Sequence, residues 1–215
     1  MPLDGVGGAA PVVQAANRAA ADACLQSVKE AIPSNLKAVE PQKKRPLMAI
    51  VGISDDLPFE TVVEGIKTQN LADHDAWPMD RIKANIKLAF KKWRYRRTET
   101  VYVVECSPAL RELLLSKERI YVGWHVASVE DFIKVVCYTK CQMYGHAVKH
   151  CNAAINTCGR CGKDGHTRSD CTAEEVCATC HKFGRKESAS HKTAAPSCPA
   201  RLYAEQRQVS MTNYG

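Results

Sequence analysis

The stretch CGRCGKDGHTRSDC, residues 158–171, has the spacing C-x2-C-x4-H-x4-C. Zinc prefers four nitrogen or sulfur ligands at the corners of a tetrahedron. Two cysteines separated by two residues lie on one tight turn and supply two corners, and the chain then returns with a histidine and a third cysteine. The stretch therefore predicts a zinc knuckle, with the metal held by Cys158, Cys161, His166 and Cys171.

Similar residues continue on both sides of this stretch. Nine of the eleven cysteines and five of the seven histidines lie between residues 137 and 198. Two further ligand sets are Cys137, Cys141, His146 and Cys151, and Cys177, Cys180, His191 and Cys198. The first set has three residues between its first two cysteines, and the third has ten residues between its second cysteine and its histidine. We expect three zinc ions, one in each set.

Two other interpretations of the cysteines stay open. Disulfides are one, although the odd cysteine count, the interleaved histidines and the lack of a signal peptide favour a reducing compartment and metal. A cross-braced site is the other, because Cys158, Cys161, Cys177 and Cys180 also read C-x2-C-x15-C-x2-C. That arrangement leaves four ligands unused, whereas knuckles in series use every cysteine of the stretch.

Composition limits the function classes. At 215 residues the chain has room for one or two small domains, and its net charge of +7 favours an anionic partner. No apolar run approaches the ~20 residues of a membrane helix. A catalytic zinc keeps one coordination position open for water, but each set here supplies four ligands. With no phosphate loop and no nucleophile set in the sequence, we expect structural zinc and no enzyme.

The rest of the chain divides into segments of different texture. Residues 1–45 form a flexible Ala-rich segment and a basic linker, disordered at the start and helical over residues 13–32. Residues 46–134 form a folded domain, residues 135–200 the three CCHC knuckles, and residues 201–215 a C-terminal tail. In the folded domain we expect strands at residues 47–53, 86–96, 98–106 and 120–126, and helices at residues 55–70 and from Pro108 through Leu114. Ser107 is expected to cap the second helix.

This β-α-β-β-α-β order predicts an α+β fold of the ferredoxin-like type, which includes the RNA-recognition-motif fold. Such motifs stack bases on aromatic residues of two central strands. The strand at residues 47–53 has no aromatic residue, and the strand at residues 98–106 offers only Tyr102. We therefore expect a protein-contact or spacer domain. A basic cluster at residues 91–97 is either a nucleic-acid contact or a solvated hairpin tip.

The knuckles differ as binders of single-stranded nucleic acid. Bases stack on exposed aromatic side chains, at ~1–3 kcal/mol per base, and cations follow the backbone. Tyr138 and Tyr144 suggest base contacts in the first knuckle. The corresponding residues of the second are Gly159 and Asp164, so we expect it mainly to hold phosphate or to act as a spacer. The candidate residues are Tyr138, Lys140, Met143, Tyr144 and Lys149 in the first knuckle, Arg160, Lys163 and Arg168 in the second, and Phe183, Arg185 and Lys186 in the third.

The order of these segments resembles a known family. The stretch RIYVGWHVASVEDFIKVV, residues 119–136, passes directly into CYTKCQMYGHAVKHC, residues 137–151, and a regular second knuckle and a C-x2-C…H-x6-C-P set follow. Over about residues 46–201 this is similar to the Gag-like protein from the first open reading frame of arthropod non-LTR retrotransposons. The three residues between Cys137 and Cys141 depart from the C-x2-C of that family.

The resemblance implies a protein that binds single-stranded RNA or single-stranded DNA, coats its element's transcript, self-associates and helps bring the ribonucleoprotein to the nucleus. It implies a cytoplasmic and nuclear location, with no membrane partner and no small-molecule substrate. Two alternatives are a host zinc-knuckle chaperone of RNA or single-stranded DNA, and an assembly module whose knuckles contact protein.

Overall fold

The computed structural model describes residues 18–33, 35–37, 42–53, 57–93, 100–146 and 148–215, and the chain divides into two compact units, residues 1–42 and 43–215. The first unit contains α1, Arg18–Ala31, within the range where a helix is expected. The expectation of disorder for the chain before it lies outside the described residues. Within the described ranges, no helix is long and apolar enough to cross a membrane.

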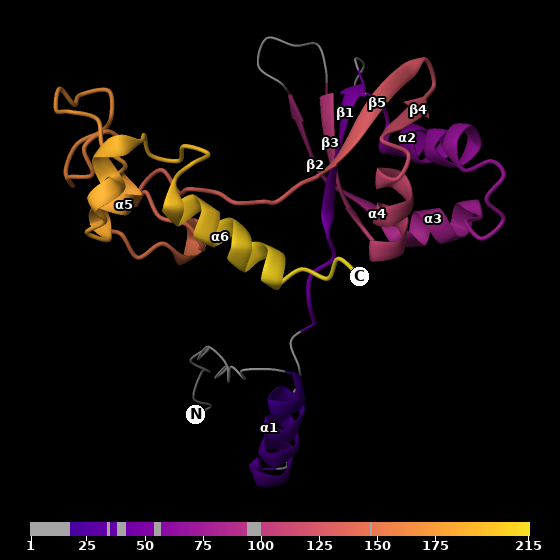
Figure 1. The fold of residues 1–215 in the computed structure, drawn as a ribbon, viewed down its shortest axis with the longest axis horizontal. Helices are drawn as coiled ribbons and strands as arrows, with labels where there is room; N and C mark the ends of the chain where they lie inside the picture. The colour runs from indigo at the N-terminus through magenta and orange to yellow at the C-terminus, as the bar shows by residue number, and fades with distance from the viewer. Residues whose placement is uncertain (1–17, 34, 38–41, 54–56, 94–99, 147) are drawn as a thin grey trace, which may run out of the picture. The chain divides into compact units, whose positions relative to one another are not determined.

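The second unit begins with a five-stranded antiparallel sheet in the order β2-β3-β1-β5-β4 (Figure 1). The strands are β1 Leu47–Ile53, β2 Ile86–Trp93, β3 Thr100–Cys106, β4 Arg119–Val122 and β5 His125–Asp131. The helices packed on it are α2 Phe59–Gly65, its π-helical continuation η1 Ile66–Asn70, α3 Met79–Asn85 and α4 Pro108–Leu115. As expected, the domain mixes helices and strands; it also contains one helix and one strand that the sequence did not predict.

The extra strand lies where a single strand was expected, and the extra helix lies where no element was predicted. The single strand expected at residues 120–126 is a hairpin of β4 and β5, because Gly123 takes a left-handed φ of 58° and turns the chain. β5 pairs with β1, and β4 extends the sheet. Helix α3 follows Pro78 in a segment for which no helix or strand was predicted. The expected helix at residues 55–70 begins at Phe59; residues 55 and 56 lie outside the described residues.

The central strand β1 is buried on both of its faces. Met48, Ile50 and Ile53 join the large core beneath the helices, whereas Ala49 and Val51 lie in a smaller cluster on the opposite face. A bulge between Val51 and Ile53 lets the side chain of Ile53 join the large core, on the same face as Met48 and Ile50. It depends on Gly52, whose φ is 111° and where a Cβ would come within 3.0 Å of the Val126 carbonyl oxygen.

The face of the sheet opposite the helices presents no exposed aromatic side chain on its central strands, β1 and β3. Tyr102 points to the helix side, is fully buried, and donates a hydrogen bond to the Leu57 carbonyl oxygen at 2.8 Å. On the open face, Phe90 and Phe132 are partly buried against the smaller cluster and meet edge to face at 5.8 Å between ring centroids. Stacking on Tyr102 would require unpacking the core.

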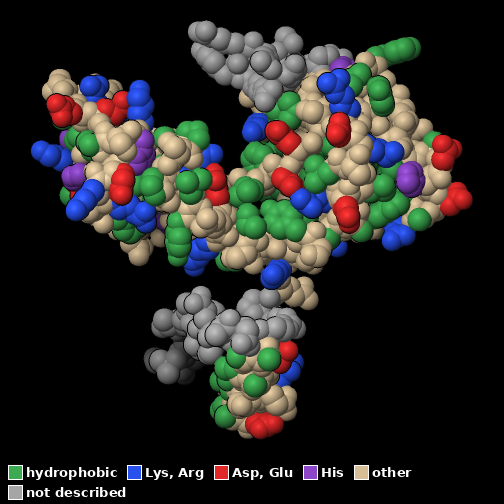
Figure 2. All heavy atoms as spheres, viewed as in Figure 1, with side chains coloured by type: hydrophobic (Ala, Val, Ile, Leu, Met, Phe, Trp, Pro, Cys, Tyr) green, Lys and Arg blue, Asp and Glu red, His purple; other side chains and the backbone are tan. Residues whose placement is uncertain are grey.

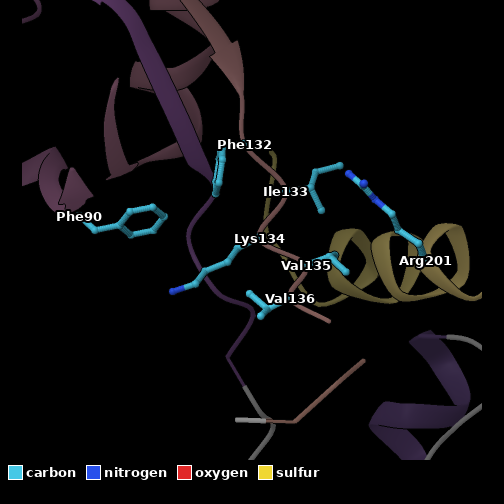
Figure 3. A pocket seen from close by; sticks show the side chains of 7 residues that line it. All are labelled: Phe90, Phe132, Ile133, Lys134, Val135, Val136 and Arg201. Atoms are coloured by element: carbon cyan, nitrogen blue, oxygen red, sulfur yellow. The ribbon is translucent and has the colours of Figure 1, made fainter. Parts of the chain in front are cut away.

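A cavity lies beside these two rings, where the chain leaves β5. It is lined by Phe90, Phe132, residues 133–136 and Arg201, as Figure 3 shows. The ammonium groups of Lys134 and Lys92 lie over the rings of Phe90 and Phe132 at 4.8 and 4.7 Å. Lys91 and Lys92, the first residues of the basic cluster, lie on β2. Residues 94–97 of that cluster lie outside the described residues.

Candidate metal centres

The second ligand set is brought together as its spacing predicts. The Sγ atoms of Cys158, Cys161 and Cys171 and a ring nitrogen of His166 all lie within 4.8 Å of one another. Cys161 Sγ lies 3.4 Å from His166 Nε2. With Zn–S of ~2.3 Å and Zn–N of ~2.0–2.1 Å, the ligand atoms of tetrahedral zinc lie roughly 3.5–3.8 Å apart. The group has the dimensions of a zinc site.

The backbone of residues 158–171 explains how so short a segment brings four ligands together. The N–H of Cys158 donates to the Lys163 carbonyl oxygen at 2.8 Å, and the N–H of Gly162 donates to the Cys158 carbonyl oxygen at 3.0 Å, which closes the turn that carries both cysteines. Gly165 has a φ of 96°, in the left-handed region that glycine tolerates, directly before His166. This glycine lets the chain reverse and present the ring to the sulfur atoms.

The turn also prepares one thiol for ionisation. Burial opposes ionisation of Cys158, but the backbone N–H groups of Cys161 and Arg160 and the neighbouring thiols outweigh it and lower the pKa of Cys158 to about 7. The Arg160 N–H lies 3.4 Å from Cys158 Sγ. The thiolate is the metal-binding form of cysteine, so this arrangement favours a cation at neutral pH.

The third set, Cys177, Cys180, His191 and Cys198, also lies within 4.8 Å between ligand atoms. Cys177 precedes helix α5, Ala178–Lys182, and Cys198 precedes helix α6, Pro199–Ser210. Cys198 Sγ lies 3.6 Å from the Sγ atoms of both Cys177 and Cys180. These separations suit metal ligands and exceed the ~2.05 Å of a disulfide bond.

One buried atom of the third set lacks the partner that a cation would provide. His191 Nε2 is buried without a hydrogen-bond partner among the described residues. Burial, followed by the sulfur atoms of Cys198 and Cys177, raises the pKa of Cys180 to about 12. A metal ion satisfies the ring nitrogen and neutralises the thiolates, so this donor set fits zinc.

The first set is only partly assembled. Cys141, His146 and Cys151 form a group within 4.8 Å, and Cys141 Sγ lies 3.3 Å from His146 Nε2. Cys137 is not part of this group; its Sγ lies 4.0 Å from the hydroxyl oxygen of Thr179, beside the third set. The expectation that Cys137 completes the first set therefore differs from the structure, because the extra residue before Cys141 moves it out of register.

The groups run in series along the chain. Cys158 and Cys161 lie with His166 and Cys171, not with Cys177 and Cys180, so the structure does not adopt the cross-braced alternative. All eleven cysteines are free. Three separate Cys/His groups could each hold a metal ion.

The three groups pack against one another. Three hydrogen bonds link them in pairs: Thr157 N–H to the Lys140 carbonyl at 2.7 Å, Val176 N–H to the Arg160 carbonyl at 2.7 Å, and Thr179 Oγ1 to the Gln142 carbonyl at 2.5 Å. Tyr144, from the first group, packs against the cysteines of the third and against Ala200. Metal binding at one group should therefore support the others.

The candidate nucleic-acid residues divide by exposure. Half-buried side chains are those of Tyr138, Lys140, Met143, Tyr144 and Arg160, and exposed ones are those of Lys149, Lys163, Arg168, Phe183, Arg185 and Lys186. The hydroxyl of Tyr144 is buried, and Arg168 pairs with Glu175. Phe183 is 58% exposed and is the most open aromatic residue of the candidate set. On the face drawn in Figure 2, Lys and Arg side chains are spread over this region rather than gathered in one patch.

Sequence reasoning missed an exposed aromatic residue beside the knuckles. Tyr203 on α6 is 63% exposed and lines the same groove as Phe183, Arg185 and Arg207. It lies in the segment that was expected to be a tail. The available signal was the run that begins at Pro199, directly after the last cysteine, since proline is favoured in the first turn of a helix.

Comparisons of the chain with family models, with curated proteins and with solved structures found no match. The fold and the sites themselves define the class: a mixed α and β domain with a five-stranded antiparallel sheet, followed by three small Cys/His groups able to hold metal ions.

Proposed function

We propose that the protein binds single-stranded nucleic acid through zinc-dependent knuckles, as a Gag-like protein that packages a retrotransposon transcript into a ribonucleoprotein. The observation that carries the proposal is the second group, where the knuckle spacing coincides with four ligand atoms within reach of one ion. The strand order β2-β3-β1-β5 supports an RNA-recognition-motif-like reading of the preceding domain, with β4 as an addition.

The contribution of zinc is to fold the knuckles. Its coordination by cysteine and histidine side chains fixes three short loops that have little apolar surface of their own. Structural zinc provides apparent free energies of ~10–16 kcal/mol in zinc-finger peptides. The Cys/His groups then hold aromatic and basic side chains in fixed positions. Loss of the metal should release those side chains together.

Base contacts are assigned to the third knuckle and α6. Phe183 and Tyr203 present exposed rings, and Arg185 and Arg207 line the same groove. Stacked rings between backbone-binding cations are the usual means of holding single strands. The sheet domain, whose central aromatic residue is buried, serves as a spacer or protein contact.

The proposal is tested by measuring single-stranded RNA binding with zinc and after chelation, across a salt titration. Binding that is lost on chelation, with a shallow salt dependence, is the expected result because stacking releases few counterions. Binding that survives chelation but collapses with salt would assign it to the basic segments, and the knuckles would then be protein-contact modules.

Phe183→Ala is expected to weaken single-stranded RNA binding by about 1–3 kcal/mol, the range for loss of one stacked base. Its zinc content should stay that of the unchanged protein, because Phe183 is exposed and is not a ligand. Fluorescence anisotropy with a labelled oligonucleotide measures the effect. Trp124→Ala is the matched control, since this ring is fully exposed on the β4–β5 hairpin. If the two variants lost the same RNA affinity, Phe183 would have no specific contact with the nucleic acid.

A second function, protein assembly, is favoured by that same hairpin. Trp124, Tyr121 and Val126 are all exposed there, and Trp124 has no shielding at all. Exposed apolar residues that cluster in this way often mark protein contacts. Light scattering with and without RNA tests it: assembly that is indifferent to RNA and lost in Trp124→Ala would favour an assembly module.

A further inference from the structure

The first and second groups are two copies of one structural repeat. Three ligand residues of the first group recur twenty positions later as ligands of the second: Cys141 and Cys161, His146 and His166, Cys151 and Cys171. The glycine before each histidine recurs at the same interval, with φ of 92° at Gly145 and 96° at Gly165. On this register the residue that corresponds to Cys158 is Tyr138, not Cys137.

The backbone hydrogen bonds establish the same register independently. The N–H of Tyr138 donates to the Met143 carbonyl oxygen at 2.9 Å, and the N–H of Cys158 donates to the Lys163 carbonyl oxygen at 2.8 Å. Tyr138 and Met143 form an isolated antiparallel bridge. In the second group the bridge joins Thr157 and Asp164, directly next to the Cys158–Lys163 pair. The turn that places the first ligand in the second group therefore places a tyrosine in the first.

A later residue of the same turn, Gln142, supports this register. The N–H of Gln142 donates to the Tyr138 carbonyl oxygen at 2.7 Å, as that of Gly162 does to the Cys158 carbonyl oxygen at 3.0 Å. Gln142 takes a φ of 58°, close to the 73° of Gly162, although a side chain makes this conformation unfavourable. The first group keeps the knuckle turn at some energetic cost, so the register is imposed by the fold.

Cys137 lies one residue before this turn and outside the ligand group. It is half-buried, and its Sγ lies 4.0 Å from the hydroxyl oxygen of Thr179, which lies between two ligands of the third group. The ring of Tyr138 instead meets the ring of His146 edge to face, with 5.9 Å between centroids. Three protein ligands with two thiolates are thus left for the first metal.

We propose that the first site is a three-ligand zinc site, held by Cys141, His146 and Cys151, in which water occupies the fourth coordination position and Cys137 is not a ligand. This inference rests on zinc binding by the Cys/His groups in the proposed function. A Cys2His set with an open position is chemically competent to hold zinc. It provides one thiolate fewer than the other groups, so its zinc should be the first removed by a chelator.

The test compares Cys137→Ser with Cys141→Ser in the full chain, without nucleic acid. Zinc content should be unchanged in Cys137→Ser, and Cys141→Ser should lose one ion per chain. With cobalt in place of zinc, the sulfur-to-metal charge-transfer band should keep its intensity in Cys137→Ser and lose intensity in Cys141→Ser. A lost ion or a weaker band in Cys137→Ser would overturn the proposal, as would an unchanged protein that binds only two ions.

A gain-of-ligand variant keeps the test independent of misfolding. Tyr138→Cys places a thiol at the position of Cys158 and should complete the first site. Loss of a residue that only hydrogen-bonds to a metal ligand weakens metal affinity ~10–100-fold. A new thiolate bound directly to the zinc should therefore strengthen retention of this ion at least about tenfold in a chelator titration. Retention that does not change would also overturn the proposal. Neither measurement involves RNA, so failure of RNA binding stays distinguishable from failure of this site.

Discussion

His166→Ala is expected to weaken zinc binding by the second group and to destabilise its folded structure. The ring of His166 lies 3.4 Å from Cys161 Sγ, within a group that has no further nitrogen donor. Apparent zinc-binding free energies of ~10–16 kcal/mol are folding free energy for such small units. Losing one of four ligands removes part of that free energy, because only the three cysteines of the group remain to hold the ion.

The effect should spread beyond the second group, since Thr157 and Val176 connect it to its neighbours by backbone hydrogen bonds. Single-stranded RNA binding should therefore fall with the zinc content. Elemental analysis and amide NMR spectra would follow both changes. His150→Ala is the matched control, because His150 is exposed and belongs to no ligand group among the described residues. A His166→Ala protein whose zinc resisted a chelator as well as that of the unchanged protein would exclude His166 as a ligand.

The sheet could be predicted from the sequence where the pattern is local. The apolar run of β1, and Ser107 with Pro108 at the start of α4, are sufficient for those elements, and Ser107 does accept the N–H of Leu110. The β4–β5 turn was missed because its flanking residues are apolar or aromatic, so Gly123 did not stand out as a turn. Its left-handed φ was the relevant property, and a hydropathy pattern does not express it.

The ligand sets show the same division. The second set follows from spacing alone, since its ligands and its turn residues coincide. The first set looked complete because a cysteine stood near the expected position, but register is fixed by the backbone bonds of Tyr138, not by the nearest thiol. The twenty-residue interval was visible in the sequence. The contact of Tyr144 with the third group was not, because it depends on how the knuckles pack.

Tyr144→Ala is expected to destabilise the array of Cys/His groups by about 2–4 kcal/mol, near the low end of aromatic-to-alanine substitutions because the ring is only half-buried. Its ring packs on the buried cysteines of the third group, and burial raises the pKa of its hydroxyl. The sequence interpretation of Tyr144 as a base contact predicts something different: weaker RNA binding at unchanged stability. Thermal unfolding of the zinc-loaded protein and RNA affinity, measured on one preparation, separate the two.

Tyr144→Phe sharpens this comparison. The hydroxyl of Tyr144 is buried without a hydrogen-bond partner among the described residues, so its removal should leave stability unchanged or raise it slightly. A ring that stacks on bases would also tolerate phenylalanine, so Tyr144→Phe alone cannot assign the role; the pair of variants can. Packing predicts that Tyr144→Ala lowers the unfolding temperature and weakens RNA binding only as far as the array unfolds. An unfolding temperature that stays constant while affinity falls in Tyr144→Ala would instead return this ring to the nucleic-acid interface.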